Sequence, residues 1–397
     1  MMKRRSFLKN SALASSLFMA PSFVSAMDDT LFTALGRKRL VLIQLHGGND
    51  GLNTVVPYRN DIYYRSRPTL AIKKSNVLKL SDELGLNKNL KPLRKLFDAG
   101  ELSIINNVGY PNPNRSHFRS SDIWQTGSAS HEVLQSGWVG RYLDAFGKNP
   151  YDAIEIGKSL SLLMKGDVKN AVVTKNAKNL YDIADDPYFN KIVSSYQDPH
   201  LSEHNMGYLY QTFIDGKQSA NYIYEKSKTK TSSFDYGNSA FGKQLKTMSE
   251  FINSGMDTKV YYASMGGFDT HASQSGRQDK LLETYAQAVG VLVKDLKTND
   301  TFKDTLILTF SEFGRRVAEN AGLGTDHGAA NNIFVIGSKL KKPGFFNDAP
   351  SLTHLDFNGD IPYKIDFRSI YANILYSWLD VANEKILSEA IAPLNVV

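Results

Sequence analysis

The sequence predicts an α/β fold in which a mostly parallel sheet lies between layers of helices. Six apolar runs with many β-branched residues are expected to form buried strands: Leu40–Leu45, Leu102–Asn106, Ala153–Ile156, Lys259–Met265, Thr305–Phe310 and Ile333–Ile336. Segments with helical periodicity separate several of them: Leu90–Phe97, Leu281–Leu296 and Ile370–Leu379. Alternation of strands and helices is typical of a parallel sheet that is covered on both faces.

The first 26 residues resemble an export signal and are expected to lie outside the fold. The basic run Lys3–Lys9 contains an arginine pair and Phe-Leu, as in twin-arginine signals, although Lys3 stands where these signals more often carry Ser or Thr. A short apolar stretch and Val24-Ser25-Ala26 follow, which indicate cleavage before residue 27. An ordinary secretory signal is the alternative. We therefore expect a periplasmic or secreted protein that comprises residues 27–397.

Composition excludes several classes of protein. The chain has no cysteine, so disulfides, thiolate metal sites and a cysteine nucleophile are excluded. Its formal charge of +7 falls to +3 without the four cations of the signal, which gives no reason to expect nucleic-acid binding. After the signal, no segment approaches ~20 unbroken apolar residues, so no transmembrane helix is expected.

Residues 175–257 differ in character from the rest of the chain. They are polar and rich in tyrosine, and a run of Lys, Ser, Thr and Asp interrupts them at Lys226–Asn238. This composition predicts a mainly helical insertion with one flexible loop, lying over or beside the sheet. A separate second domain is the alternative.

The helix at Leu281–Leu296 links two of the predicted strands. It follows Lys259–Met265 and precedes Thr305–Phe310, which gives a βαβ unit with both strands parallel. Residues that follow the two strands should therefore meet at one edge of the sheet. Ligands of open α/β sheets bind outside the carboxyl ends of the strands, so this edge is where a site is expected.

Polar, ionisable side chains cluster at these strand ends, next to glycines that permit sharp turns. Most of them follow three of the predicted strands, and the last two precede the Ile333–Ile336 strand. They are His46, Asp50, Asp269, His271, Glu312, Asp326 and His327. Imidazole and carboxylate ligands without thiolate suit zinc, manganese or another divalent metal. A capping Asp or a hydrogen-bonded His explains any one of them, but the set together favours a metal or catalytic site.

A further cluster, Asn112–Trp124, follows the Leu102–Asn106 strand after a proline-rich turn. Ser116 is expected to open a helix, either as an N-cap or as a nucleophile whose alkoxide the helix N-terminus stabilises. Arg119 in this cluster and Arg315 after the Thr305–Phe310 strand are candidates to bind two oxygens of an anion, which a guanidinium does in a bidentate manner.

These motifs together resemble those of a bacterial exported family known as domain of unknown function 1501. The motifs are Leu-His-Gly-Gly-Asn-Asp-Gly-Leu-Asn from Leu45, Asn-Arg-Ser-His-Phe-Arg from Asn114, Gly-Gly-Phe-Asp-Thr-His from Gly266, Ser-Glu-Phe-Gly-Arg-Arg from Ser311 and Gly-Thr-Asp-His-Gly from Gly324. The likeness covers roughly Arg39 to Leu379. That family is similar to the alkaline phosphatase superfamily, which includes sulfatases, and this implies an α/β sandwich, a two-metal site and a Ser or Thr nucleophile.

The resemblance carries over only in part. Asp269, His271 and His327 stand where the superfamily has metal ligands, and Ser116 stands where it has the nucleophile. Glu312 and Phe313 replace its usual Asp-His pair, so a carboxylate is kept and an imidazole is lost. His46 replaces an Asp, with Asp50 nearby as a substitute. These departures count against a second metal ion and, with it, against hydrolysis.

The expected function is that of an exported metal-dependent hydrolase of phosphate or sulfate esters, acting on a small-molecule or glycan ester. One or two ions of zinc, manganese or calcium would activate the Ser116 hydroxyl. The alternative is a catalytically degenerate member that acts as an exported binding or envelope-assembly protein. An α/β-hydrolase esterase is set aside because Gly237–Gly242 misses the spacing of a nucleophile elbow.

Overall fold

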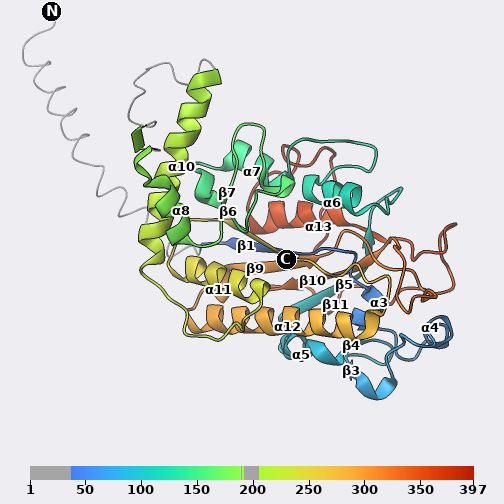
Figure 1. Cartoon of the computed structure of the whole chain (residues 1–397). Helices are drawn as coiled ribbons and strands as arrows, with labels where there is room; N and C mark the ends of the chain where they lie inside the picture. The colour runs from blue at the N-terminus through green and yellow to red at the C-terminus, as the bar shows by residue number, and fades with distance from the viewer. Residues whose placement is uncertain (1–36, 189, 192–204) are drawn as a thin grey trace, which may run out of the picture. The chain divides into compact units, whose positions relative to one another are not determined.

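The computed structural model describes residues 37–188, 190–191 and 205–397, which form a mostly parallel sheet between two layers of helices (Figure 1). Strands of the main sheet lie in the order β11-β5-β10-β9-β1-β8-β6-β7, with β12 paired to β5. Their bounds are Arg39–Leu45 (β1), Leu102–Gly109 (β5), Ala153–Ile156 (β6), Val172–Thr174 (β7), Val260–Met265 (β8), Thr305–Phe310 (β9), Asn331–Ile336 (β10), Gly344–Phe345 (β11) and Ile365–Asp366 (β12). The predicted fold class and all six predicted strands are confirmed.

The centre of the sheet is a parallel trio in which β1 lies between β8 and β9. Leu42 of β1 pairs with Tyr262 on one side and Leu308 on the other. In contrast, β10 is antiparallel to both of its neighbours, β9 and β5. The amino end of β10 therefore lies at the edge where β1, β5, β8 and β9 have their carboxyl ends. Residues that precede β10 share an edge with residues that follow the other four strands.

Both faces of the sheet are buried. Along β1, successive apolar side chains point alternately into two cores, one on each face of the sheet. Val41 and Ile43 pack with helices α5 (Lys91–Asp98), α11 (Ala240–Asn253) and α12 (Gln274–Thr298). Leu40 and Leu42 pack with α6 (His117–Thr126), α7 (Trp138–Phe146) and α13 (Phe367–Asn373), which lie on the opposite face (Figure 1). Burial on both sides explains why the strands are continuous apolar runs.

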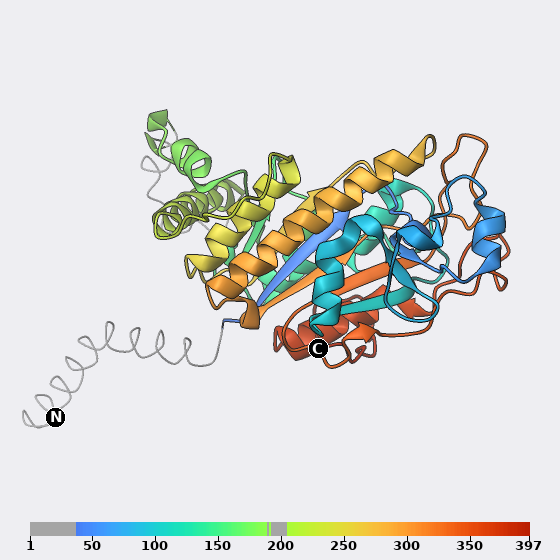
Figure 2. The same ribbon diagram turned by 90° about the horizontal axis from the view of Figure 1, so that it is seen from below.

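Helix α12 makes the predicted crossover between β8 and β9. It runs along the sheet beside α11 and contains the predicted segment Leu281–Leu296 (Figure 2). The predicted helix Ile370–Leu379 is found as α13 followed by a π-helical turn at Ile374–Trp378. A small second sheet, in the order β2-β4-β3, comprises Val55–Val56 (β2), Val77–Lys79 (β3) and Gly85–Asn87 (β4), beside helices α3 (Gly51–Thr54) and α4 (Asp61–Ser66).

Residues 175–257 contain three of the described helices: α8 (Ala177–Ala184), α10 (Asn205–Ser227) and α11. Leu245 and Met248 of α11 are fully buried in the core beneath the sheet. The last helix of this segment thus belongs to the main helical layer. The predicted signal, residues 1–26, lies outside the described residues. Within the described part of the chain, no helix is long and apolar enough to cross a membrane.

Candidate metal centre

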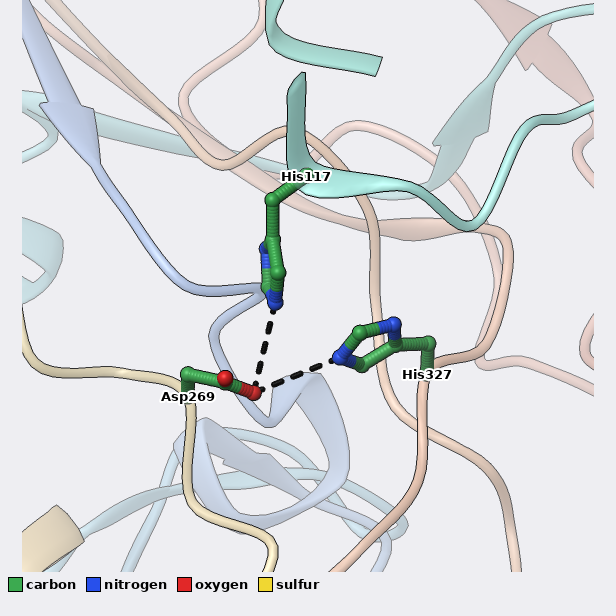
Figure 3. Close-up of side chains that lie close together, drawn as sticks. All are labelled: His117, Asp269 and His327. Atoms are coloured by element: carbon green, nitrogen blue, oxygen red, sulfur yellow. Dashed lines mark hydrogen bonds and ion pairs between the residues drawn. The ribbon is translucent and has the colours of Figure 1, made fainter. Parts of the chain in front are cut away.

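Three side chains from separate parts of the sequence converge at the carboxyl edge of the sheet. His117 begins α6 after β5, Asp269 follows β8, and His327 precedes the antiparallel β10. One ligand atom from each lies within 4.8 Å of the other two. Both imidazoles point at the Asp269 carboxylate (Figure 3). The antiparallel course of β10 is what brings His327 to this edge.

Two of the separations between these atoms suit a tetrahedrally coordinated cation. Oδ1 of Asp269 lies 3.3 Å from Nε2 of His117, 3.3 Å from Nε2 of His327 and 3.0 Å from Nε2 of His271. Zinc with ligand bonds of about 2.0–2.2 Å has ligands roughly 3.3–3.5 Å apart. Nε2 of His117 is also buried and has no hydrogen-bond partner among the described residues, which is expected of a nitrogen that binds a cation. These side chains therefore fit a divalent metal.

Glu312 holds His117 from behind. Its Oε1 lies 2.8 Å from Nδ1 of His117 and accepts a second hydrogen bond from the Gly47 N–H, also at 2.8 Å. The hydrogen bond with Glu312 raises the pKa of His117 above its ordinary value, against the opposing effect of burial. A proton on Nδ1 leaves the lone pair of Nε2 to face Asp269. Such carboxylate–histidine pairs orient metal-binding imidazoles in many proteins. Glu312 thus supports a ligand.

His327 is oriented in the same manner by a backbone group. Its Nδ1 lies 2.7 Å from the Arg115 carbonyl oxygen and donates to it. Burial lowers the pKa of His327, so its ring is neutral and Nε2 keeps a lone pair. The guanidinium of Arg115 in turn pairs with Asp360, whose side chain is fully buried. Asp360 therefore fixes the carbonyl that selects the tautomer of His327.

Asp269 is held by Arg315. NH2 of the buried Arg315 lies 2.7 Å from Oδ1 of Asp269. Burial raises the pKa of Asp269, but the hydrogen bond from Arg315 and the positive charge of its guanidinium oppose this effect, and the pKa is lowered to about 2. Nε of Arg315 donates to the Gly48 carbonyl at 2.7 Å, and its remaining nitrogens donate to other carbonyls. With its donors engaged, Arg315 positions Asp269 and is not available to bind an anion.

The turn after β1 has to be glycine to allow this packing. Gly47 has φ +117°, and a Cβ there would lie 2.3 Å from the backbone nitrogen of Asp269. A Cβ on Gly48 would lie 2.3 Å from the Phe313 ring. Gly47 thus lets the turns after β1 and β8 touch, and Gly48 leaves room for the Phe313 ring.

His271 and Asp326 form the outer border of the cluster. Nε2 of His271 lies 2.9 Å from Nε2 of His327, and its Nδ1 lies 3.2 Å from Oδ1 of Asp326. Asn320 donates to the same Oδ1 at 3.0 Å, and this hydrogen bond lowers the pKa of Asp326. His271 is thus placed to become a fourth ligand, with Asp326 as its support.

Asp50 and Arg119, which were predicted as site residues, do not contact the three-ligand group and have other partners. Asp50 is fully buried, and its Oδ2 lies 2.6 Å from NH1 of Arg67. Gln274 also donates to Oδ2 of Asp50. Arg119 donates to the carbonyls of Ser130 and Glu132. The structure does not bring Asp50 into the cluster, because a buried carboxylate needs the nearby guanidinium. Arg119 likewise holds a loop.

A pocket of about 390 Å³ opens beside the cluster. His46 lines it together with His117, Ser121, Asp122, Asp269 and Glu312. Burial lowers the pKa of His46, which keeps this imidazole neutral. The structure therefore places His46 in the pocket wall, next to the three-ligand group.

The serines near His117 have different environments. Ser116 is exposed, precedes α6 as its N-cap residue and makes no capping hydrogen bond through its side chain. Ser120 is fully buried, and its Oγ donates to the Glu312 carbonyl at 2.6 Å. Ser121 lines the pocket. The predicted helix start is confirmed, but the Ser116 hydroxyl is unpaired in the described part of the chain.

His117 is a member of the cluster that sequence reasoning did not single out. It stands beside Ser116 in a motif that the sequence did highlight, at the end of a predicted strand. The signal was therefore present: a histidine directly after the Pro-rich turn at a strand end.

Fold and geometry together define an α/β protein with a candidate His/Asp metal centre at the carboxyl edge of its sheet. Residues 37–354 match the family described as protein of unknown function (DUF1501). The match covers most of the chain, so the protein belongs to this family, as the motifs indicated. No curated protein matches the sequence.

Solved structures resemble the chain at low identity. The PsFucS1 sulfatase from Pseudoalteromonas sp. is 12% identical, with a TM-score of 0.41 over 94% of this chain and 73% of that one. The C-terminal periplasmic domain of EptC from Escherichia coli, in complex with zinc, is 12% identical, with a TM-score of 0.40 over 87% and 82%. A protein in the alkaline phosphatase superfamily from Vibrio parahaemolyticus is 10% identical, with a TM-score of 0.33 over 79% and 63%.

Proposed function

We propose that this protein is an exported, metal-dependent hydrolase of phosphate or sulfate esters. The observation that carries the proposal is the convergence of His117, Asp269 and His327 on one point, each held from behind by a further hydrogen bond, next to an open pocket. Packing alone does not require three supported ligands to face one another. Export rests on the arginine pair and cleavage signal of the first 26 residues.

A divalent cation bound there would polarise the ester and activate the attacking oxygen. His117, Asp269 and His327 would bind it, with His271 as a candidate fourth ligand. The other residues act on these ligands: Glu312 orients His117, and Arg315 keeps Asp269 ionised. The rest of the substrate would lie in the adjacent pocket.

Two groups can supply the attacking oxygen, the Ser116 hydroxyl or water. The family resemblance favours Ser116, which directly precedes His117 and whose hydroxyl makes no hydrogen bond with the described residues. If Ser116 is the nucleophile, Ser116→Ala should lower the rate by several orders of magnitude, whereas attack by water predicts a change of a few-fold. Ser121→Ala serves as a comparison, because Ser121 lines the pocket whereas Ser116 precedes the pocket residue His117.

The test of the proposal is metal content followed by an ester screen. Purified protein should contain at least one divalent metal per chain, and a His117→Ala, His327→Ala double variant should contain none. The matched control replaces His131 and His354, which lie outside the cluster. Full metal content in the double variant, or no turnover of any phosphate or sulfate ester at any metal loading, would count against a hydrolase.

The second candidate is an exported binding or envelope-assembly protein. Arg315 and Arg119, which the sequence suggested as anion-binding residues, donate their hydrogen bonds to backbone carbonyls. Neither guanidinium is therefore available for a substrate anion, which favours this second candidate. A protein that holds metal but turns over no ester would support this candidate.

A further inference from the structure

The pocket beside the metal centre is lined by acids. Three carboxylates face it, those of Asp122, Asp269 and Glu312, and no Lys or Arg lines it among the described residues. Asp269 and Glu312 are each engaged by the centre itself. The carboxylate of Asp122 is different, because it is half-buried and makes no hydrogen bond in the described part of the chain. Burial raises the pKa of Asp122 and the nearby Arg119 guanidinium lowers it, but Arg119 donates its hydrogen bonds to the carbonyls of Ser130 and Glu132 instead. The Asp122 carboxylate therefore faces the pocket without a hydrogen-bonded partner among the described residues.

The positive charges of the metal centre are balanced by the carboxylates that line the pocket. Arg315 is paired with Asp269 and with backbone carbonyls. The described residues offer one group of three metal ligands, which suits one divalent ion. That ion and Arg315 together carry three positive charges, which equal the three negative charges of the pocket carboxylates. Arg119 adds one positive charge near Asp122, which one negative charge of an incoming anion balances and a second negative charge exceeds.

We infer that the pocket selects esters whose acid group carries a single negative charge, such as a sulfate monoester or a phosphate diester, over a doubly charged phosphate monoester. Asp122 is the residue that imposes this selection. The inference rests on the proposed function and specifies its substrate class. A second unit of negative charge would face Asp122 without a compensating cation, and like charges at pocket distances repel appreciably.

The direct test uses two ligands that differ by one charge. Phenylphosphonate is doubly charged at mildly alkaline pH, whereas its monomethyl ester is singly charged and otherwise nearly identical. Binding of both to the zinc-loaded protein is measured by titration calorimetry, which requires no turnover. The wild-type protein should bind the monoester more tightly. Asp122→Asn should move the ratio of the two affinities toward the doubly charged ligand by roughly 3- to 30-fold.

The matched control is Asp98→Asn, because Asp98 is an exposed aspartate of α5, on the opposite face of the sheet. It should leave the ratio unchanged. Tighter wild-type binding of phenylphosphonate, or an equal ratio in the Asp122 and Asp98 variants, overturns the inference.

Measurements of turnover distinguish a failure of this inference from a failure of the proposed function. Rates on p-nitrophenyl sulfate, bis-p-nitrophenyl phosphate and p-nitrophenyl phosphate distinguish the two kinds of singly charged ester. Asp122→Asn should raise the rate on p-nitrophenyl phosphate relative to the other two. If none is hydrolysed, the proposed function fails while the calorimetric ratio still decides the charge selection.

Discussion

Replacing Glu312 by glutamine should weaken metal binding without removing a ligand. Glu312 is 1% exposed, and its Oε1 accepts hydrogen bonds from His117 and from the Gly47 backbone, both at 2.8 Å. Glutamine keeps the shape and one acceptor oxygen but loses the charge. A hydrogen bond to a charged acceptor is worth about 1 kcal/mol more than one to a neutral acceptor. Since about 1.4 kcal/mol is tenfold in affinity, the loss should be about fivefold, just below the 10- to 100-fold range known for such supporting groups.

The assay is competition for zinc with a chromophoric chelator. Glu155→Gln is the matched control, because Glu155 is also a buried glutamate that accepts a backbone hydrogen bond, from Ser161 at 2.8 Å, and it does not belong to the cluster. The control should change zinc affinity less than twofold. The reasoning is refuted if Glu312→Gln binds zinc as tightly as the wild type while its metal-free form stays folded.

Three further predictions concern the export signal and the metal centre. Replacing both Arg4 and Arg5 by lysine should leave the precursor in the cytoplasm. Export of that variant at the normal rate would contradict the twin-arginine assignment. The pKa of Asp269, about 2, lies below its ordinary 3.8, so its contacts stabilise the metal-free fold above pH 3.8 and lose that effect as pH falls toward 2. The difference in melting temperature between Asp269→Asn and the wild type should therefore shrink over that range, and a constant difference would contradict the assignment. Asp360→Asn should lower zinc affinity about tenfold by releasing Arg115, and unchanged affinity would show that the pair only stabilises a loop.

The strands were predictable because most are buried on both faces and therefore read as continuous apolar runs. All seven residues of β1 and all six of β9 are buried. The direction of β10 was not predictable, because an apolar run is the same whichever way it pairs. That direction matters for the site, since the antiparallel β10 takes His327 to the edge where β8 delivers Asp269. The sequence therefore indicated both residues as candidate ligands, but it did not indicate the strand direction that brings them together.

The predicted ligands that joined the cluster and those that did not differ in their neighbours. Asp269 and His271 follow two glycines, which leave them uncovered. Asp50 follows two glycines as well, yet Arg67, 17 residues later, pairs with it in the interior. No local pattern marks that partner, because the pairing depends on how α4 returns toward β1. The same holds for Arg315, whose partners are carbonyls of distant turns.

One further feature bears on the number of metals. The Phe313 ring lies against both imidazoles, with its centre 4.8 Å from that of His117 and 4.7 Å from that of His327. A phenyl ring cannot bind a cation through a lone pair, and here it covers one side of both imidazoles. Burial by such neighbours lowers the pKa of His327 and keeps its Nε2 able to bind a metal. Phe313 therefore helps to hold both imidazoles of the three-ligand group, and the described residues offer one such group, which suits a single divalent ion.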